Sequence, residues 1–120
     1  MRYLLLIYGV EARYAQMAPA EMQPLRQAWQ RFDKEILASG VVEASNRLRP
    51  TTTASTVRVR SGKAAITDGP FAETKEQLGG FYLVQVPSLD EALAWAKRVP
   101  SSEYGSVEVR PIWPREEFMA

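Results

Sequence analysis

One polar segment of this 120-residue chain places three carboxylates and one ammonium group within nine positions. Asp68 and Glu73 are the candidates for a general acid or base, because a carboxyl group at the mouth of a pocket can move a proton. Lys75 is the candidate for binding an anionic group, and Glu76 for contacting the same ligand or moving a proton beside it. The carboxylates could also bind Mg²⁺ or Ca²⁺, but their spacing does not fit an EF-hand, so we predict no metal site.

A purely structural interpretation of the same segment stays open. Asp-Gly-Pro at 68–70 is ordinary turn chemistry, in which the carboxylate accepts hydrogen bonds from nearby backbone N–H groups. The three later charges could simply be a solvated cluster, since charge-rich loops are usually exposed. Asp68 could serve the turn and the site at once.

Three aromatic residues are predicted to contact the same ligand. Tyr8 ends the first predicted strand and Tyr82 begins a later one, so their hydroxyl groups could meet at one edge of a sheet. Phe71, inside the polar segment, is the third predicted ligand-binding residue. Tyrosine at the rim of a hydrophobic core is the common structural alternative for the first two.

The composition excludes several kinds of site. The chain has no histidine and no cysteine, which removes Ser-His-Asp and Cys-His catalysis, haem ligation, iron–sulfur clusters and zinc sites built on those side chains. We therefore predict no cofactor. Basic and acidic residues number 15 and 14, so charge gives no reason to expect nucleic acid or a membrane as partner. The N-terminal apolar run is too short for a secretory signal or a membrane helix, and we expect a cytoplasmic protein.

Hydrophobic patterning predicts the strands that would position these residues. They are expected at 3–8, 41–48, 56–60, 63–67 and 79–86, with a last strand from 107 to the prolines at 111 and 114. The runs at 3–8 and 79–86 are nearly continuous in apolar residues and are expected to be central strands. A tight turn at Ser61-Gly62 joins the third and fourth strands into a hairpin.

Two amphipathic helices complete the pattern. The first is expected to begin close to Pro24, to end at Gly40 and to bury Met22, Leu25, Trp29, Phe32 and Ile36. The second begins at a capping box from Ser88 to Glu91, ends at Pro100 and is expected to bury Leu89, Ala92, Leu93, Ala96 and Val99. Trp95 falls off that stripe, and residues 9–18 are expected to be a loop.

This order predicts an α+β fold in one domain over residues 1–120, a ferredoxin-like βαββαβ sandwich with an extra β-hairpin. Both helices would cover one face of an antiparallel sheet. Because the central runs are apolar throughout, the second face should be apolar as well. We therefore predict a homodimer in which two sheets pack face to face.

The sequence DGPFAETKEQLGGFY at 68–82 resembles the signature of the DGPF proteins, a branch of the YCII-related family. The segments 1–8, 56–63 and 106–111 resemble this family too. The resemblance implies a dimeric fold of the α/β-barrel type. DGPF members often occur beside extracytoplasmic-function sigma factors, which implies an association with transcription. Enzymatic relatives are thought to use a His-Asp pair, in one case to remove chloride from a chlorinated hydroxyquinol, and this histidine-free chain cannot carry that pair.

Two functions follow as hypotheses. In the first, the dimer holds a small-molecule pocket near the loop at 68–76 and carries out lyase- or hydrolase-like acid–base chemistry without histidine. In the second, the dimer is a non-catalytic accessory or regulatory module associated with a sigma factor. Direct nucleic-acid binding is not expected, because the chain has no concentrated basic face. Whether the protein is an enzyme stays open.

Overall fold

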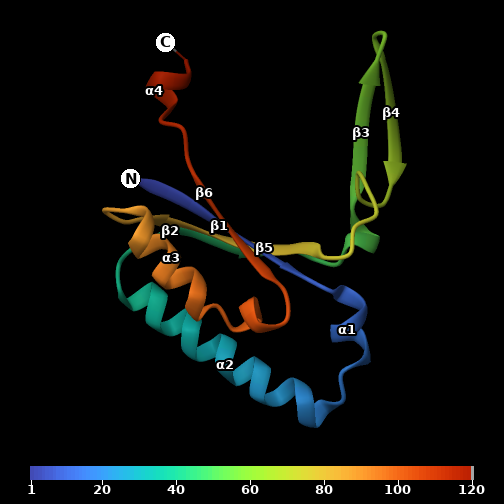
Figure 1. The fold of residues 1–120 in the computed structure, drawn as a ribbon. Helices are drawn as coiled ribbons and strands as arrows, with labels where there is room; N and C mark the ends of the chain where they lie inside the picture. The colour runs from blue at the N-terminus through green and yellow to red at the C-terminus, as the bar shows by residue number, and fades with distance from the viewer. Residues whose placement is uncertain (120) are drawn as a thin grey trace.

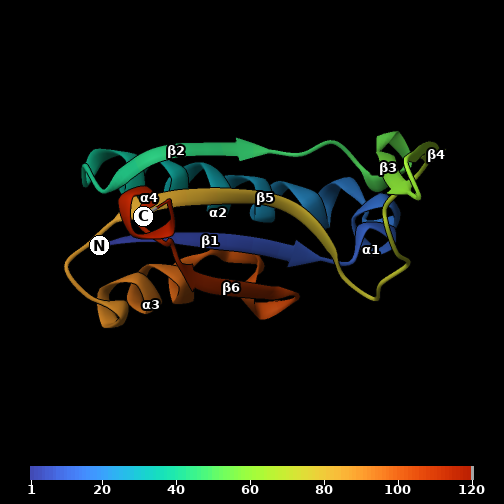
Figure 2. The ribbon, with the colours of Figure 1, turned by 90° about the horizontal axis from the view of Figure 1, so that it is seen from above.

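The fold is built on a four-stranded antiparallel sheet with the strand order β2-β5-β1-β6 (Figures 1 and 2). The computed structural model describes residues 1–119, apart from the side chain of Glu103. The strands of this sheet are β1 (Arg2–Gly9), β2 (Val42–Arg47), β5 (Gln77–Gln85) and β6 (Ser106–Pro111). This strand order confirms the predicted ferredoxin-like α+β fold.

The two nearly continuous apolar runs form the central strands β1 and β5, as predicted. Leu5 of β1 lies opposite Tyr82 of β5 on one side and Val109 of β6 on the other. β6 is an edge strand that ends at Pro111, in agreement with the rule that proline is tolerated where no ladder hydrogen bond is required.

Two helices, α2 (Pro19–Ala38) and α3 (Leu89–Arg98), lie against the same face of this sheet (Figure 1). The core between them includes Leu5, Ile36, Val84 and Val99, which are fully buried. Phe32 of α2 sits at the centre of an aromatic cluster, with its ring edge-on to three others: Trp29 at 6.1 Å, Tyr82 at 5.6 Å and Trp95 at 6.3 Å between centroids. Such edge-on pairs stabilise a core beyond their buried area.

The start of α2 corrects one prediction. The helix begins at Pro19 and continues through Pro24, although we expected it to begin near Pro24. Proline at the first helical position costs no hydrogen bond, and the Glu21 carboxylate accepts one from the Ala18 N–H at 3.4 Å. Pro24 leaves the Ala20 carbonyl without its helical donor, but Ala20 is exposed and water can supply one.

The buried stripe of α3 corrects a second prediction. Ala92, Ala96 and Val99 are buried as expected, whereas Leu89 and Leu93 are 46% and 38% exposed. Ala92 and Ala96 face the sheet, and their small side chains allow α3 to approach it closely. Trp95, expected off the stripe, instead turns toward α2 and packs on the core. The predicted cap is present, because the Ser88 hydroxyl oxygen accepts a hydrogen bond from the Glu91 N–H at 3.3 Å.

Short helices occupy three connections and the segment after β6. They are α1 (Glu11–Gln16), η1 (Thr51–Thr53), η2 (Pro100–Glu103) and α4 (Arg115–Phe118). α1 lies inside the predicted loop at 9–18, which is therefore wrong over those six residues. The Glu11 carboxylate of α1 accepts hydrogen bonds from the N–H and the hydroxyl of Thr51, at 2.8 and 2.7 Å. A tertiary contact of this kind leaves no signal in the local sequence.

The predicted hairpin is confirmed as a separate two-stranded sheet, β3 (Ser55–Arg60) and β4 (Lys63–Asp68). Ser61 and Gly62 have φ values of 51° and 77°, the left-handed pair that a two-residue type I′ turn requires. The hairpin stands away from the four-stranded sheet at one end, and the C-terminal segment with α4 rises at the other (Figure 1).

The second face of the four-stranded sheet carries no helix, and we call it the helix-free face. Its apolar side chains are half-buried: Leu4 and Leu6 of β1, and Phe81 and Leu83 of β5. In the described part of the chain, no helix is both long enough and apolar enough to span a bilayer.

Candidate functional site

The signature loop, residues 68–76, leaves the end of β4 and returns to the start of β5. Two hydrogen bonds to the Gly69 backbone hold its turn. The Gly69 N–H donates to the Ala54 carbonyl at 2.7 Å, and the Thr56 hydroxyl donates to the Gly69 carbonyl at 2.8 Å. Gly69 has a φ of 97°, which favours glycine. The Asp68 side chain is exposed, and no hydrogen bond reaches its carboxylate from the described residues.

Three more predicted site residues of this loop face water. Phe71 is 74% exposed, and Glu73 and Lys75 are exposed as well. Arg58 of the hairpin donates to the Phe71 carbonyl at 2.7 Å, which ties the loop to β3. None of these side chains lines either of two cavities formed by the described residues, of about 640 and 510 Å³.

Glu76 differs from the rest of the loop, because its side chain turns inward. One carboxylate oxygen, Oε2, accepts a hydrogen bond from the Ser106 hydroxyl of β6 at 3.3 Å. The other, Oε1, is buried and has no hydrogen-bond partner among the described residues. Leaving such an oxygen unpaired costs on the order of 1–3 kcal/mol. Glu76 is thus the one predicted site residue with an unused, buried acceptor.

The two predicted tyrosines lie on opposite faces of the sheet and do not meet at one edge. Tyr82 faces the helices and is 5% exposed, and its hydroxyl donates to the Asp33 carboxylate of α2 at 2.6 Å. Burial, followed by this bond to Asp33, raises the pKa of Tyr82 well above its ordinary value. The two hydroxyl groups do not meet because Tyr82 lies opposite Leu5, which is three positions before Tyr8. Odd and even positions of β1 face opposite sides of the sheet, so Leu5 and Tyr8 lie on different faces.

Tyr8 belongs to the helix-free face and joins a small polar group there. It lies opposite Ser106 of β6, and its hydroxyl is 3.5 Å from the Glu108 carboxylate, a long contact. Arg110 pairs with the other oxygen of Glu108 at 2.7 Å. Because Glu76 bonds to Ser106, these residues are brought together at the end of the sheet next to the signature loop. We call Tyr8, Glu76, Ser106 and Glu108 the polar end of the helix-free face.

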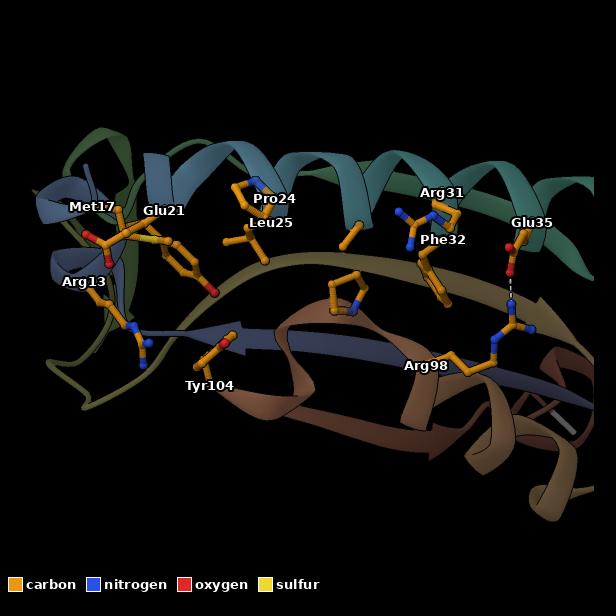
Figure 3. Close-up of a pocket in the computed structure, with 13 residues that line it drawn as sticks. Arg13, Met17, Glu21, Pro24, Leu25, Arg31, Phe32, Glu35, Arg98 and Tyr104 are labelled. Atoms are coloured by element: carbon orange, nitrogen blue, oxygen red, sulfur yellow. Dashed lines mark hydrogen bonds and ion pairs between the residues drawn. The ribbon is translucent and has the colours of Figure 1, made fainter. Parts of the chain in front are cut away.

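A groove of about 640 Å³ lies on the other side of the molecule, and we call it the helix-side groove (Figure 3). It runs between α2 and the segment from the end of α3 to Tyr104, with α1 at one end. Its lining residues come from these elements: Arg13, Tyr14, Met17, Glu21, Pro24, Leu25, Ala28, Arg31, Phe32, Glu35, Arg98, Pro100 and Tyr104.

Sequence reasoning missed this groove because its walls come from segments far apart in the chain. The available signal was the apolar stripe of α2, which continues past the core. Phe32 and Ile36 are buried against the sheet, whereas Leu25, seven residues before Phe32, lines the groove.

The described residues offer no ready metal centre. Among them, no group of three or more Asp or Glu side chains lies close enough together to hold a metal ion. The carboxylates of the signature loop are spread between exposed positions and the inward-turned Glu76.

Comparison with known proteins gives a family and a relative. The family model described as the YCII-related domain matches residues 1–116. An uncharacterised protein of Rhizobium meliloti (strain 1021) is 39% identical over 114 residues, which are 93% of this chain and 92% of that protein.

Proposed function

Since the chain belongs to the YCII-related domain family, we propose that it works as a homodimer that binds a small molecule at the polar end of the helix-free face. Two copies would pack these faces against each other, and the signature loops would lie at the rim of the interface. Glu76 would bind the ligand or move its proton, with Tyr8 as a hydrogen-bonding partner. Asp68, Glu73, Lys75 and Phe71 would contact the part of the ligand that reaches the rim.

The observation that carries this proposal is the amount of surface that one chain leaves uncovered. The accessible surface is 8893 Å², whereas a compact monomer of 13.5 kDa exposes about 6,500 Å². The radius of gyration is 16.7 Å, against about 14 Å for a compact domain of this length. The excess, roughly 2,400 Å², matches what one partner buries in a large homodimer interface.

The chemistry of the uncovered surface supports a second copy as its cover. The helix-free face is apolar along β1 and β5, and its charged side chains include two ion pairs within the chain, Arg2 with Glu43 at 3.0 Å and Arg110 with Glu108. An apolar face whose charged side chains are paired within the chain can be covered by a second copy without leaving those charges unpaired.

The projecting segments extend the same surface. The hairpin exposes Val57, Val59 and Ile66, and the C-terminal segment exposes Trp113 and Phe118. Both segments rise on the side of the helix-free face, at its two ends (Figures 1 and 2). A second copy seated between them would cover side chains that have nothing to pack on in one chain.

The dimer is tested by the mass in solution. Light scattering should give twice the 13.5 kDa of one chain. Leu6→Glu places a charge at the centre of the helix-free face and should give a folded monomer. Leu37→Glu, at a half-exposed position of α2, is the matched control and should remain dimeric. A wild-type monomer, or a dimer unaffected by Leu6→Glu, contradicts the interface.

The small-molecule site is tested by a thermal-shift screen against a metabolite panel. A ligand at a hundred times its Kd stabilises the fold by about 2.7 kcal/mol, which is readily measured. The shift should disappear in Glu76→Gln and Asp68→Asn and persist in Glu117→Gln, an exposed C-terminal control. A shift that survives Glu76→Gln contradicts the site.

The alternative function is an accessory module associated with a sigma factor. The exposed apolar side chains of the hairpin are the feature that favours it, because they would suit a protein partner as well as a second copy. A silent screen together with a hairpin-dependent complex with a sigma factor would support this alternative.

A further inference from the structure

We propose that the helix-side groove binds an aromatic carboxylate, with Arg13 as the residue that pairs with the carboxylate group. The groove lies on the helix side of the sheet, whereas the proposed dimer interface is the helix-free face (Figures 1 and 3).

Two glycines fix the aromatic walls of the groove. A Cβ atom on Gly9 would lie 3.0 Å from the ring and the hydroxyl of Tyr14, so that ring packs directly on the backbone of β1. Gly105 follows Tyr104, and a Cβ there would lie 2.1 Å from the Tyr8 carbonyl oxygen. The Tyr14 ring is therefore held against β1, and the backbone next to Tyr104 is held against that of Tyr8, which fixes the position of both walls.

Arg13 is held against an aromatic ring and has no ion-pair partner among the side chains that the structure describes. Its guanidinium lies 4.2 Å from the centre of the Tyr104 ring, a stacking contact that leaves its N–H groups free to donate. Among the carboxylates whose side chains the structure describes, none forms an ion pair with Arg13. A carboxylate ligand would provide that partner, in the two-bond geometry that guanidinium groups favour.

The other arginines of the groove differ from Arg13. Arg98 forms an ion pair with Glu35 and also lies over the Trp95 ring at 4.6 Å, so its charge already has a partner. Arg31 lies further along α2, away from Tyr104 (Figure 3). Arg13 therefore differs from Arg98 in that it stacks on an aromatic ring without an ion pair to any carboxylate whose side chain the structure describes.

The rest of the groove specifies a flat, apolar body for the ligand. Leu25 and Ala28 of α2 and Pro100 of η2 line the space beside the tyrosines. Burial raises the pKa of Tyr14, so its hydroxyl stays protonated at neutral pH and can donate a hydrogen bond. A small inorganic anion would leave these apolar walls uncovered, and a neutral hydrocarbon would leave Arg13 without a partner. The volume of about 640 Å³ accommodates one or two rings.

The test uses 2-naphthoate as the probe and 2-naphthamide as its neutral counterpart, with binding measured by calorimetry and by amide chemical shifts. The naphthoate should bind at least about tenfold more tightly than the amide, as expected for a charge-assisted pair. Its largest shifts should fall on residues 13–17 and 104–105. Equal affinities for the acid and the amide, or no binding of naphthoate, would overturn the proposal.

Three exposed arginines provide matched variants that should all fold. Arg13→Gln should weaken naphthoate binding about tenfold, because one charged hydrogen-bond pair is lost. Arg31→Gln should weaken it about twofold through long-range charge alone, and Arg26→Gln, on α2 but outside the groove, should have no effect. Equal losses in all three would indicate non-specific attraction and overturn the site. The Leu6→Glu variant of the helix-free face should bind naphthoate as the wild type does, which separates this proposal from the proposed dimer.

Discussion

The two faces of the sheet come from the same strands, but only one of them is covered within the chain. On the helix side, Leu5 and Val84 are fully buried under α2 and α3. On the helix-free face, their neighbours Leu4 and Leu83 are only half-buried, by adjacent side chains of the sheet itself. A strand that is apolar on both faces needs both faces buried, and within this chain only the face toward α2 and α3 is buried.

The polar groups of the two faces differ in the same way. The helix side holds one short hydrogen bond, from Tyr82 to Asp33 at 2.6 Å, between elements that pack tightly. The helix-free face holds the long contact from Tyr8 to Glu108 at 3.5 Å and the unpaired oxygen of Glu76. The short Tyr82–Asp33 bond thus lies between packed elements, whereas the long Tyr8–Glu108 contact and the Oε1 atom of Glu76 lie toward the face that carries no helix.

The largest expected effect separates two adjacent leucines. In the Leu6→Glu background, which we expect to be monomeric, Leu5→Ala should lower the free energy of unfolding by about 2–5 kcal/mol, because it leaves a cavity in the core. Leu4→Ala should cost about 1 kcal/mol or less, since its side chain is already half in water. Urea denaturation measures both, and similar losses would remove the distinction between the faces.

A smaller effect tests the strand contact on which both faces depend. Gly105→Ala should destabilise the fold by about 3 kcal/mol, because the new Cβ atom would meet the Tyr8 carbonyl oxygen at 2.1 Å. Gly79→Ala is the control, with its nearest contact at 3.9 Å, and should cost less than about 1 kcal/mol. Thermal unfolding of both variants gives the comparison, and a harmless Gly105→Ala would mean that β1 and β6 can separate.

The next effect compares the two tyrosines. Tyr82→Phe removes a short bond to a half-buried carboxylate and should cost about 1–3 kcal/mol at neutral pH, whereas Tyr8→Phe should cost less than about 0.5 kcal/mol. Urea unfolding at pH 7 measures the difference. Equal costs would show that the hydroxyl groups of the two faces are equally well satisfied.

The pH dependence of Tyr82 gives a further test of the closed face. Its pKa is raised in the folded chain above the ordinary value of 10.0, so the folded state retains a proton that the unfolded state loses. The corresponding stability is fully present below pH 10 and is lost as the pH rises above it. The wild type should therefore lose stability more steeply above pH 10 than Tyr82→Phe. Absorbance titration should show one fewer late-ionising phenol in the variant.

The smallest expected effect concerns an exposed ion pair at the border of the helix-free face. Arg2→Gln breaks the contact with Glu43, in which both side chains are at least one-third exposed. Water and salt screen such pairs, so the loss should be below about 1 kcal/mol and should vanish in high salt. A larger loss, measured by urea unfolding with and without salt, would indicate that Arg2 is shielded from water by a partner.

The sequence predicts the sheet and the hairpin well because their signals are local. Alternation at 56–60, a Ser-Gly turn and two apolar runs each specify a strand through neighbouring residues. The helix boundaries and α1 depend on tertiary contacts, such as Glu11 with Thr51, and a local pattern does not contain them. The prediction for Trp95 is wrong for a similar reason. The small alanines of α3 allow Trp95 to turn toward Phe32 on α2, and the pattern of α3 alone does not contain that contact.

The candidate site is predicted less completely than the fold. The signature loop is recognisable in the sequence, but which of its carboxylates turns inward depends on Ser106, thirty residues further along the chain. Likewise, the partner of Tyr82 is Asp33 on α2, forty-nine residues away, rather than a residue of the loop. Residue types therefore suggested the chemistry, whereas their grouping required the three-dimensional arrangement.

The long connection between β2 and β5 leaves and rejoins the sheet at neighbouring points, since the Leu48 N–H donates to the Gly79 carbonyl at 2.8 Å. The segment between them, with its hairpin, is in effect an insertion in a simpler four-stranded unit. Its length could change during evolution without altering the register of any strand in the four-stranded sheet. The turn at Ser61-Gly62 is accordingly a natural place to insert a label or a second domain while the sheet stays intact.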